Sequence, residues 1–353
     1  MWMKNCWTVA ASSSEIGRKI LARTVLGVPL VFYRTLEGRA VVMHDQCPHR
    51  HMPLSIGTLC DNTIRCGYHG MRIDPTGVCV RIPAQDKIPE NARVQIYPLI
   101  ERYTFAWIWM GDPELANPDL IPDVHWMDDP QWAVSEGYHR VECNYQYMND
   151  NLLDLSHESY VHEQTIGNEA VAESPATTTV TGNQVRVHRD MWNCDAPPFY
   201  VGTTGAVGKI NRWHTTIFTP PSTNIIENGS YPVEGSRDQA MEKRIIHLVT
   251  PETESTSHYF WAVARSFRID DAALTEYIRE QTSATFDEDA KLLAIQQRLH
   301  GNNPKSFFPI ALKVDAGPIQ ARRIVARLLA LERPEPAGTQ THFRPGLTCN
   351  SSI

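Results

Sequence analysis

The sequences Cys47-Pro48-His49 and Cys66-Gly67-Tyr68-His69 are separated by sixteen residues near the start of a chain of 353 residues. They supply two thiols and two imidazoles, with a spacing that suits two neighbouring loops. This donor set can bind a tetrahedral zinc ion, or a two-iron cluster with both cysteines on one iron and both histidines on the other. In the second case, the histidines raise the reduction potential above that of an all-cysteine ferredoxin. The stretch therefore predicts a metal centre built on turns.

A zinc ribbon and a pair of buried, metal-free loops are the alternatives. Zinc ribbons usually carry two Cys-x-x-Cys-like knuckles, whereas the first limb here is Cys-Pro-His. Gly67 and Gly70 let the backbone approach closely, so that its amides can reach bridging sulfides. Cys60 and Cys79 are interpreted as packing residues, as buried free cysteines usually are.

Short strands and turns surround this motif. Glu37-Gly38 and Asp74-Pro75-Thr76-Gly77 are typical turn sequences. Strands are expected at residues 29–34, 40–44, 78–82 and 103–109. We therefore expect a small β domain over residues 1–110. Residues 111–130 are rich in Pro, Asp and Asn, which disfavours helices, so the boundary between two domains is placed at residues 115 and 116.

The longer C-terminal part combines helical and strand patterns. Helices are expected from Val141 to about His162, from Asp271 to about Leu299 and from Pro318 to about Leu331. Ser283 is a point where the second of these could break. Strands are expected near residues 177–187, 214–218, 245–249 and 259–263. The second domain, residues 116–353, is therefore expected to be α+β.

A second cluster of possible metal ligands lies in the first of these helices. His157 and His162 are five residues apart, too far for one face of a regular helix, so they converge only where a helix ends or bulges. Asp154 lies three residues before His157 and could accept the second ring N–H of a ligating histidine. Two imidazoles and one carboxylate, with open positions, form the facial triad of non-haem Fe(II) oxygenases. Unrelated surface or core histidines are the alternative.

The carboxylate of such a triad must come from elsewhere, and residues 286–293 offer three acidic side chains. At about 100° per residue, Asp289 falls within an apolar arc, whereas Glu288 lies at its edge and Asp287 opposite. The arc consists of Phe286, Leu292, Leu293, Ile295 and Leu299. An inward carboxylate is costly unless a metal or an ion compensates it, so Asp289 is the candidate. Asp287 and Glu288 are interpreted as a solvated helix face.

Composition excludes several classes of protein. The chain has 33 basic and 40 acidic side chains, a net charge of −7 and no basic block, which argues against a nucleic-acid partner. No stretch approaches the roughly eighteen apolar residues of a membrane span, and the N-terminus lacks a signal-peptide core. Eight cysteines are too few for a disulfide scaffold. A cytoplasmic protein without a membrane segment is expected.

Together, the two clusters resemble the α subunit of the Rieske non-haem iron oxygenases. His51 and Gly67 stand where the respiratory-complex Rieske signature carries an extra cysteine pair, so the oxygenase-type signature is the better match. The second cluster resembles the family pattern Asn-x-x-Asp-x-x-His-x4-His followed by a late helical Asp. Further stretches resemble the vanillate and dicamba O-demethylase branch, at residues 81–85, 218–221, 250–253 and 315–323.

The resemblance implies a Rieske β-sandwich domain followed by a helix-grip (START-like) catalytic domain with an antiparallel sheet. It implies a [2Fe-2S] cluster held by Cys47, His49, Cys66 and His69, and a mononuclear Fe(II) held by His157, His162 and Asp289. It also implies a homotrimer in which the cluster of one subunit faces the iron of the next. Asp154 would link His69 of the neighbouring copy to a local iron ligand, and Asn151 belongs to the same catalytic motif.

The activity implied is O-demethylation of a methoxylated, vanillate-like aromatic acid with O2, giving a phenol and formaldehyde. No Gly-x-Gly-x-x-Gly element and no four-cysteine ferredoxin pattern is present, so NAD(P)H and flavin are expected on a separate ferredoxin-type reductase. The substrate acid needs polar partners in a mostly apolar cavity, for which His247 and Asn224 are candidates. A structural histidine and a turn asparagine are the alternative for these two. His51 is interpreted as a surface group at the subunit contact.

Other functions remain open at this stage. Hydroxylation of a benzylic methyl group and ring dihydroxylation use the same scaffold. A Rieske electron-transfer or binding protein without oxygenase activity belongs to a different class, as does a zinc-dependent interaction module.

Overall fold

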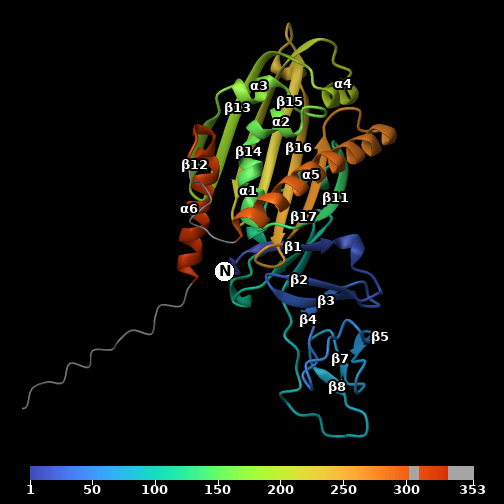
Figure 1. The fold of residues 1–353 in the computed structure, drawn as a ribbon. Helices are drawn as coiled ribbons and strands as arrows, with labels where there is room; N and C mark the ends of the chain where they lie inside the picture. Colours follow the sequence, from blue (N-terminus) through green and yellow to red (C-terminus); the bar gives the residue numbers. More distant parts are fainter. Residues whose placement is uncertain (302–309, 333–353) are drawn as a thin grey trace, which may run out of the picture.

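The computed structural model describes residues 1–301 and 310–332. An N-terminal part of small sheets is followed by a large sheet with helices across one face (Figure 1). All strand pairs in both parts are antiparallel. The α+β fold class is thus confirmed.

The N-terminal part contains three small sheets. Their orders are β1(Trp7–Ser12)-β10(Phe105–Trp109)-β9(Leu99–Arg102), β2(Leu21–Val25)-β3(Val28–Arg34)-β4(Ala40–His44) and β5(Thr58–Cys60)-β6(Thr63–Arg65)-β7(Arg72–Ile73)-β8(Cys79–Arg81). The strands expected from β-branched and aromatic runs are all present. The turn at Asp74 also forms, because its carboxylate accepts hydrogen bonds from the backbone amides of Thr76 and Val78, at 2.8 and 3.1 Å.

The crossing between the two parts contains only short 3-10 turns, as its composition predicts. These are η2(Pro113–Leu115), η3(Pro118–Leu120) and η4(His125–Met127). Asp112 and Asn117 cap the first two, each followed by a proline that starts the turn.

The C-terminal part is built on a seven-stranded sheet. Its order is β11(Ala133–Val141)-β17(Ser257–Arg265)-β16(Met241–Pro251)-β15(Thr223–Pro232)-β14(Lys209–Thr219)-β13(Gln184–Asp195)-β12(Thr177–Thr181). The expected strands correspond to β12–β14, β16 and β17. Strands β11 and β15 were not predicted, because Asn224, Asn228 and Gly229 in β15, and the polar residues of β11, are unusual in strands.

Helices cover one face of this sheet (Figure 1). They are α1(Tyr145–Leu153), η5(Leu155–His157), α2(Glu158–Val161), α3(Glu169–Glu173), α4(Pro198–Thr204), α5(Ala272–His300) and α6(Ala316–Leu331). The long α5 continues unbroken through Ser283, whose hydroxyl lies 3.4 Å from His139 Nε2. The expected helix over 141–162 is wrong, since Val141 ends β11 and the rest is divided into α1, η5 and α2.

One of several buried hydrophobic clusters spans the two parts. Trp7 and Trp109 of the N-terminal part pack in the same buried cluster as Ile246 and Phe260 of the large sheet. None of the described helices is both long enough and apolar enough to cross a membrane. The four-stranded sheet β5–β8 lies at the opposite end of the molecule from α2 and α3 (Figure 1).

Candidate metal centres and the cavity beside them

Two matched loops carry the first cluster. In each, the cysteine amide donates to a carbonyl five residues on (Cys47 to Met52, Cys66 to Met71), at 2.8 Å. The cysteine carbonyl accepts from the amide four residues on, that of His51 or Gly70, at 2.9 and 3.1 Å. His51 and Gly70 both have positive φ, 55° and 72°, so they occupy equivalent turn positions.

These loops bring all four expected ligands together. The Cys47 and Cys66 side chains are buried, whereas His49 and His69 are exposed, with their Nδ1 atoms 3.1 Å apart. Burial raises the pKa of the Cys47 thiol to about 11, and the neighbouring Cys66 adds to this effect. A metal cation compensates thiolate charge in such a buried position. Two sulfurs on the inside and two ring nitrogens on the outside fit a [2Fe-2S] cluster with mixed ligands.

The second cluster forms where the helical structure is interrupted between α1 and η5. Helix α1 ends at Leu153, and Asp154 is extended, with φ −117° and ψ 92°, before the short η5 and α2 begin. This break brings His157 and His162 to one side, with ring centroids 5.2 Å apart. Their Nε2 atoms lie 3.4 and 3.2 Å from Asp289 Oδ1 on α5. The predicted bend and the predicted convergence with Asp289 are both present in the structure.

The donor atoms of this triad fit one metal ion. One ligand atom from each of His157, His162 and Asp289 lies within 4.8 Å of the other two. Burial acts to lower the pKa of His162, but Asp289 and Glu288 outweigh it and raise the pKa to about 9. For Asp289, burial acts to raise the pKa, and hydrogen bonding from His162 with the charge of His157 lowers it overall. The pocket thus favours a positive charge between the imidazoles and the carboxylate.

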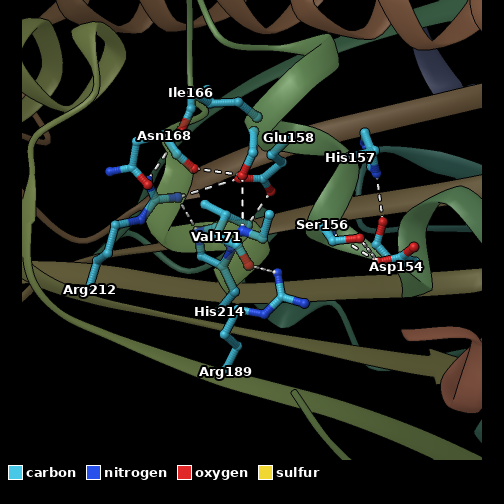
Figure 2. A network of polar contacts seen from close by, with 12 residues as sticks. Asp154, Ser156, His157, Glu158, Ile166, Asn168, Val171, Arg189, Arg212 and His214 are labelled. Atoms are coloured by element: carbon cyan, nitrogen blue, oxygen red, sulfur yellow. Dashed lines mark hydrogen bonds and ion pairs between the residues drawn. The ribbon is translucent and has the colours of Figure 1, made fainter. Parts of the chain in front are cut away.

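Outer contacts fix which ring nitrogen faces the metal. His157 donates from Nδ1 to the backbone carbonyl of Asp154 at 2.6 Å (Figure 2), and His162 donates from Nδ1 to Glu288 Oε2 at 2.6 Å. Both Nε2 atoms are then left for the metal. Asn151 completes the site, because its Nδ2 lies 3.2 Å from Asp289 Oδ1 and 3.5 Å from His157 Nε2.

Asp154 accepts the second ring N–H of His157, as predicted, but through its backbone carbonyl. Its carboxylate Oδ1 instead accepts from the amide and hydroxyl of Ser156, at 3.0 and 2.6 Å (Figure 2). The expectation for Glu288 is wrong. Glu288 is not simply solvated, because its longer side chain reaches sideways from α5 to His162. Asp287 is more exposed and lies 3.3 Å from His139 Nε2.

The predicted apolar arc of α5 is only partly buried. Phe286 and Leu293 face the core, whereas Leu292, Ile295 and Leu299 are exposed beside His157 and Asp154. The inward face is more polar than hydrophobic periodicity predicts, since it also carries Thr282, Thr285, Asp289 and Gln297.

A partly open cavity of about 50 Å³ lies beside the triad. Its walls combine apolar and charged side chains: Asn151, Leu152, Leu155, His157, Glu158, His162, Ile166, Phe199, Tyr200, Arg212, His214, Ile226, Asn228, Lys243, Ile245, His247, Phe286 and Asp289. His247 lies in the wall, with Nδ1 2.6 Å from the Tyr259 hydroxyl and Nε2 without a partner in the described chain. Asn224 is buried and donates to Asn149 Oδ1 at 2.9 Å, and it does not line this cavity.

Sequence reasoning missed the charged residues of the wall. Glu158, Arg212 and Lys243 are at most 5% exposed. They leave little signal in the sequence, because Arg212 lies between Asn211 and His214 in β14, a strand of mixed polarity.

Comparison with known proteins accounts for both centres. Residues 6–98 match the Rieske [2Fe-2S] domain, and residues 141–331 match the family described as vanillate O-demethylase oxygenase C-terminal domain. The chain is a Rieske non-haem iron oxygenase subunit. The oxygenase therefore has a [2Fe-2S] domain and a non-haem iron site.

Curated relatives extend over nearly the whole oxygenase. It is 40% identical to a putative toluene-4-sulfonate monooxygenase system iron-sulfur subunit from Comamonas testosteroni, over 94% of this chain and 98% of the relative. It is 38% identical to the vanillate O-demethylase oxygenase subunit of Pseudomonas sp. (strain HR199 / DSM 7063), over 94% and 96%. These relatives place the oxygenase in the O-demethylase and monooxygenase branch.

Solved structures give the same result. Dicamba monooxygenase bound to 3,6-dichlorosalicylic acid superposes with a TM-score of 0.88 at 30% identity, covering 94% of this chain and 99% of the other. The same enzyme with non-haem iron and dicamba gives a TM-score of 0.80 at 29% identity, covering 93% and 98%. The N-terminal Rieske domain and the catalytic domain with its large sheet are thus confirmed.

Proposed function

We propose that this oxygenase removes the methyl group of a methoxylated, vanillate-like aromatic acid, using O2 and electrons from a separate reductase, and gives a phenol and formaldehyde. The observation that carries the proposal is the His157–His162–Asp289 triad opening on a cavity with apolar walls and buried cations. Such a cavity suits an aromatic ring with an acidic substituent. Oxygen insertion into the methyl C–H bond gives a hemiacetal, which collapses to phenol and formaldehyde.

Each metal has its ligands in this proposal. Cys47, His49, Cys66 and His69 hold the [2Fe-2S] cluster, and His157, His162 and Asp289 hold Fe(II). When bound, the cluster supplies electrons singly, and the ferrous ion provides open positions for O2 activation. Asn151 holds the Asp289 carboxylate through Nδ2, and the Asp154 carbonyl holds the His157 ring. Of the two polar partners expected for the substrate, His247 remains proposed, whereas Asn224 does not line the cavity and is no longer a candidate.

We also propose a homotrimer, with a domain boundary between residues 115 and 116. His49 and His69 are exposed, and they lie in the loops before β5 and between β6 and β7. The β5–β8 sheet lies far from α2 (Figure 1). A cluster in that position is better placed to pass electrons to a neighbouring copy, through Asp154 beside its iron site. NAD(P)H and flavin belong to the ferredoxin-type reductase.

Supplied with a reductase, NADH and vanillate, the oxygenase is expected to release formaldehyde and the demethylated phenol in equal amounts. Colorimetric formaldehyde assay and chromatography of the phenol measure both products. The same assay with 4-hydroxybenzoate, which has no methoxy group, is the control. Product from the methoxy acids without formaldehyde would contradict demethylation.

Benzylic hydroxylation is the second candidate, favoured by the 40% identity to the putative toluene-4-sulfonate monooxygenase subunit. It predicts 4-(hydroxymethyl)benzenesulfonate from toluene-4-sulfonate, and no formaldehyde. Comparing kcat/KM for vanillate and toluene-4-sulfonate decides between the two.

A Glu288→Gln variant is expected to bind Fe(II) about 10- to 100-fold more weakly, because the ring of His162 loses its charged hydrogen-bond acceptor. Titration of the metal-depleted protein with Fe(II) under anaerobic conditions measures this change. Asp287→Asn is the matched control, since Asp287 contacts His139 rather than a triad residue. Equal iron affinity in Glu288→Gln and the parent protein would remove the proposed role of Glu288.

A further inference from the structure

Buried cations form one end of the cavity, away from His247. His214, Asn228 and Lys243 are direct neighbours across strands β14, β15 and β16. Arg212 lies two residues before His214 on β14, and all four side chains line the cavity. Arg212 is 2% exposed and Lys243 is 1% exposed. These charges are therefore part of the interior.

Arg212 and Arg189 have acidic neighbours. Lys243 is also attracted by the charge of Glu158, but without a hydrogen bond to it. Arg212 Nη2 lies 3.4 Å from Glu158 Oε2 (Figure 2). Arg189 interacts electrostatically with Asp154 as well as with Glu158, and donates to the carbonyl of Val171. His214 accepts from Arg212 Nη2 through Nε2 at 2.5 Å, so it is neutral and offers no compensating charge.

Lys243 is the buried cation whose charged group has no hydrogen-bond acceptor among the described residues. Within the described residues its Nζ has no hydrogen-bond partner, and its contacts are the ring faces of Phe199 and Tyr200, at 4.6 and 4.2 Å. A buried ammonium without an acceptor is unfavourable, and burial together with Arg212 lowers the pKa of Lys243 to about 7. The buried Nζ of Lys243 thus faces the cavity without an acceptor in the described chain.

The position of this charge relative to the triad follows from strand geometry. Lys243, Ile245 and His247 alternate along β16 and all line the cavity. At about 3.4 Å per residue, the backbone positions of Lys243 and His247 are roughly 14 Å apart. Ile245 pairs with Ile226 on β15 between them. The cavity therefore has a cationic end, an apolar middle and an end at His247, close to Phe286 on α5.

We propose that Lys243 and Arg212 form an anion subsite that binds the acidic group of the aromatic substrate, while the ring lies against Ile226 and Ile245. This inference rests on the proposed function, because it assigns the acidic group of the same substrate to one end of the same cavity. A carboxylate and a sulfonate share the required chemistry: each is a monoanion whose oxygens accept from an ammonium and a guanidinium. The apolar middle then orients the ring so that its far substituent points away from the cations.

The test compares an acid with its neutral counterpart. Vanillate and 2-methoxyphenol have the same methoxy and hydroxyl groups, and differ only in the carboxylate. Lys243→Met replaces the buried ammonium by an apolar side chain of similar length, so folding is preserved. Binding to the purified, metal-loaded oxygenase, without reductase, is measured by titration calorimetry. Toluene-4-sulfonate is titrated in parallel to compare the two kinds of anion.

Lys243→Met is expected to weaken vanillate binding about 10- to 100-fold, because a charge-assisted hydrogen bond is lost, and to change 2-methoxyphenol binding less than about twofold. Binding of toluene-4-sulfonate is expected to weaken as well. The anion whose affinity falls more is the one that the subsite fits better. Lys209→Met, which removes an exposed lysine from β14, should leave all three affinities unchanged.

Two results would overturn the subsite: equal weakening of the acid and the neutral ligand, or unchanged binding of both acids. The proposed function is tested separately by formaldehyde release. Acid-selective loss in Lys243→Met without formaldehyde from any methoxy acid would support the subsite and remove demethylation. Formaldehyde release with no acid-selective loss would support demethylation and remove the subsite.

Discussion

Asp289→Ala is expected to lower turnover by more than about a thousandfold while the visible spectrum of the cluster stays unchanged. The Asp289 carboxylate is the one anionic donor of the triad, and it lies between the two Nε2 atoms. Removing it leaves two neutral imidazoles, which hold Fe(II) weakly. A bound metal lowers the activation free energy of such a reaction by several kcal/mol, and losing about 4 kcal/mol corresponds to a thousandfold fall in turnover. Substrate-dependent O2 consumption with reductase and NADH measures turnover.

Asp287→Ala is the matched control, because Asp287 is two residues before Asp289 on the same helix and its side chain is 55% exposed. We expect it to retain most of the activity. His162→Ala should behave like Asp289→Ala, with an intact cluster and no turnover. Full oxygenase activity in Asp289→Ala and His162→Ala would show that the triad is not the iron site.

Cys66→Ser is expected to yield a protein without acid-labile sulfide, without the visible cluster absorption and without turnover. The Cys66 thiol is buried beside Cys47, and a serine hydroxyl is a much poorer ligand for iron than a thiolate. Without the cluster, electrons have no route from the reductase to the mononuclear iron. Sulfide analysis, absorption spectra and O2 consumption measure the three effects.

Cys60→Ser is the control for this variant, because Cys60 ends the neighbouring strand β5 and is only partly buried. It should keep the spectrum and the activity of the parent. Thermal unfolding of both variants separates cluster loss from misfolding of the domain. A Cys66→Ser protein that keeps its sulfide and colour would exclude Cys66 as a ligand.

The sequence was most informative where the structure depends on nearby residues. The Cys47 and Cys66 loops are closed by hydrogen bonds within five residues, so their spacing alone could indicate their geometry. Strand patterns were correct where β-branched and aromatic residues dominate, as in β3 and β4. Strand β15 was missed because Asn224 and Asn228 face the interior, where tertiary contacts outweigh strand propensity.

Contacts between distant segments could not be predicted in this way. The pairing of Glu288 with His162 joins residues 126 positions apart, and it depends on how α5 packs over α2. The ring of His157 bonds to the Asp154 carbonyl rather than its carboxylate, because the chain is extended at that residue. The buried Lys243 and Arg212 come together only when β14 and β16 are placed on either side of β15.

Three successive acids on α5 contact histidines on other elements: Asp287 contacts His139, Glu288 contacts His162, and Asp289 contacts both His157 and His162. Each step along the helix turns the side chain by about 100°, so these contacts together fix the rotation of the helix about its axis. A single deletion earlier in α5 would rotate all three carboxylates away from their histidines at once. Helix α5 can therefore accept many changes of residue identity, but almost no change of length before Asp287.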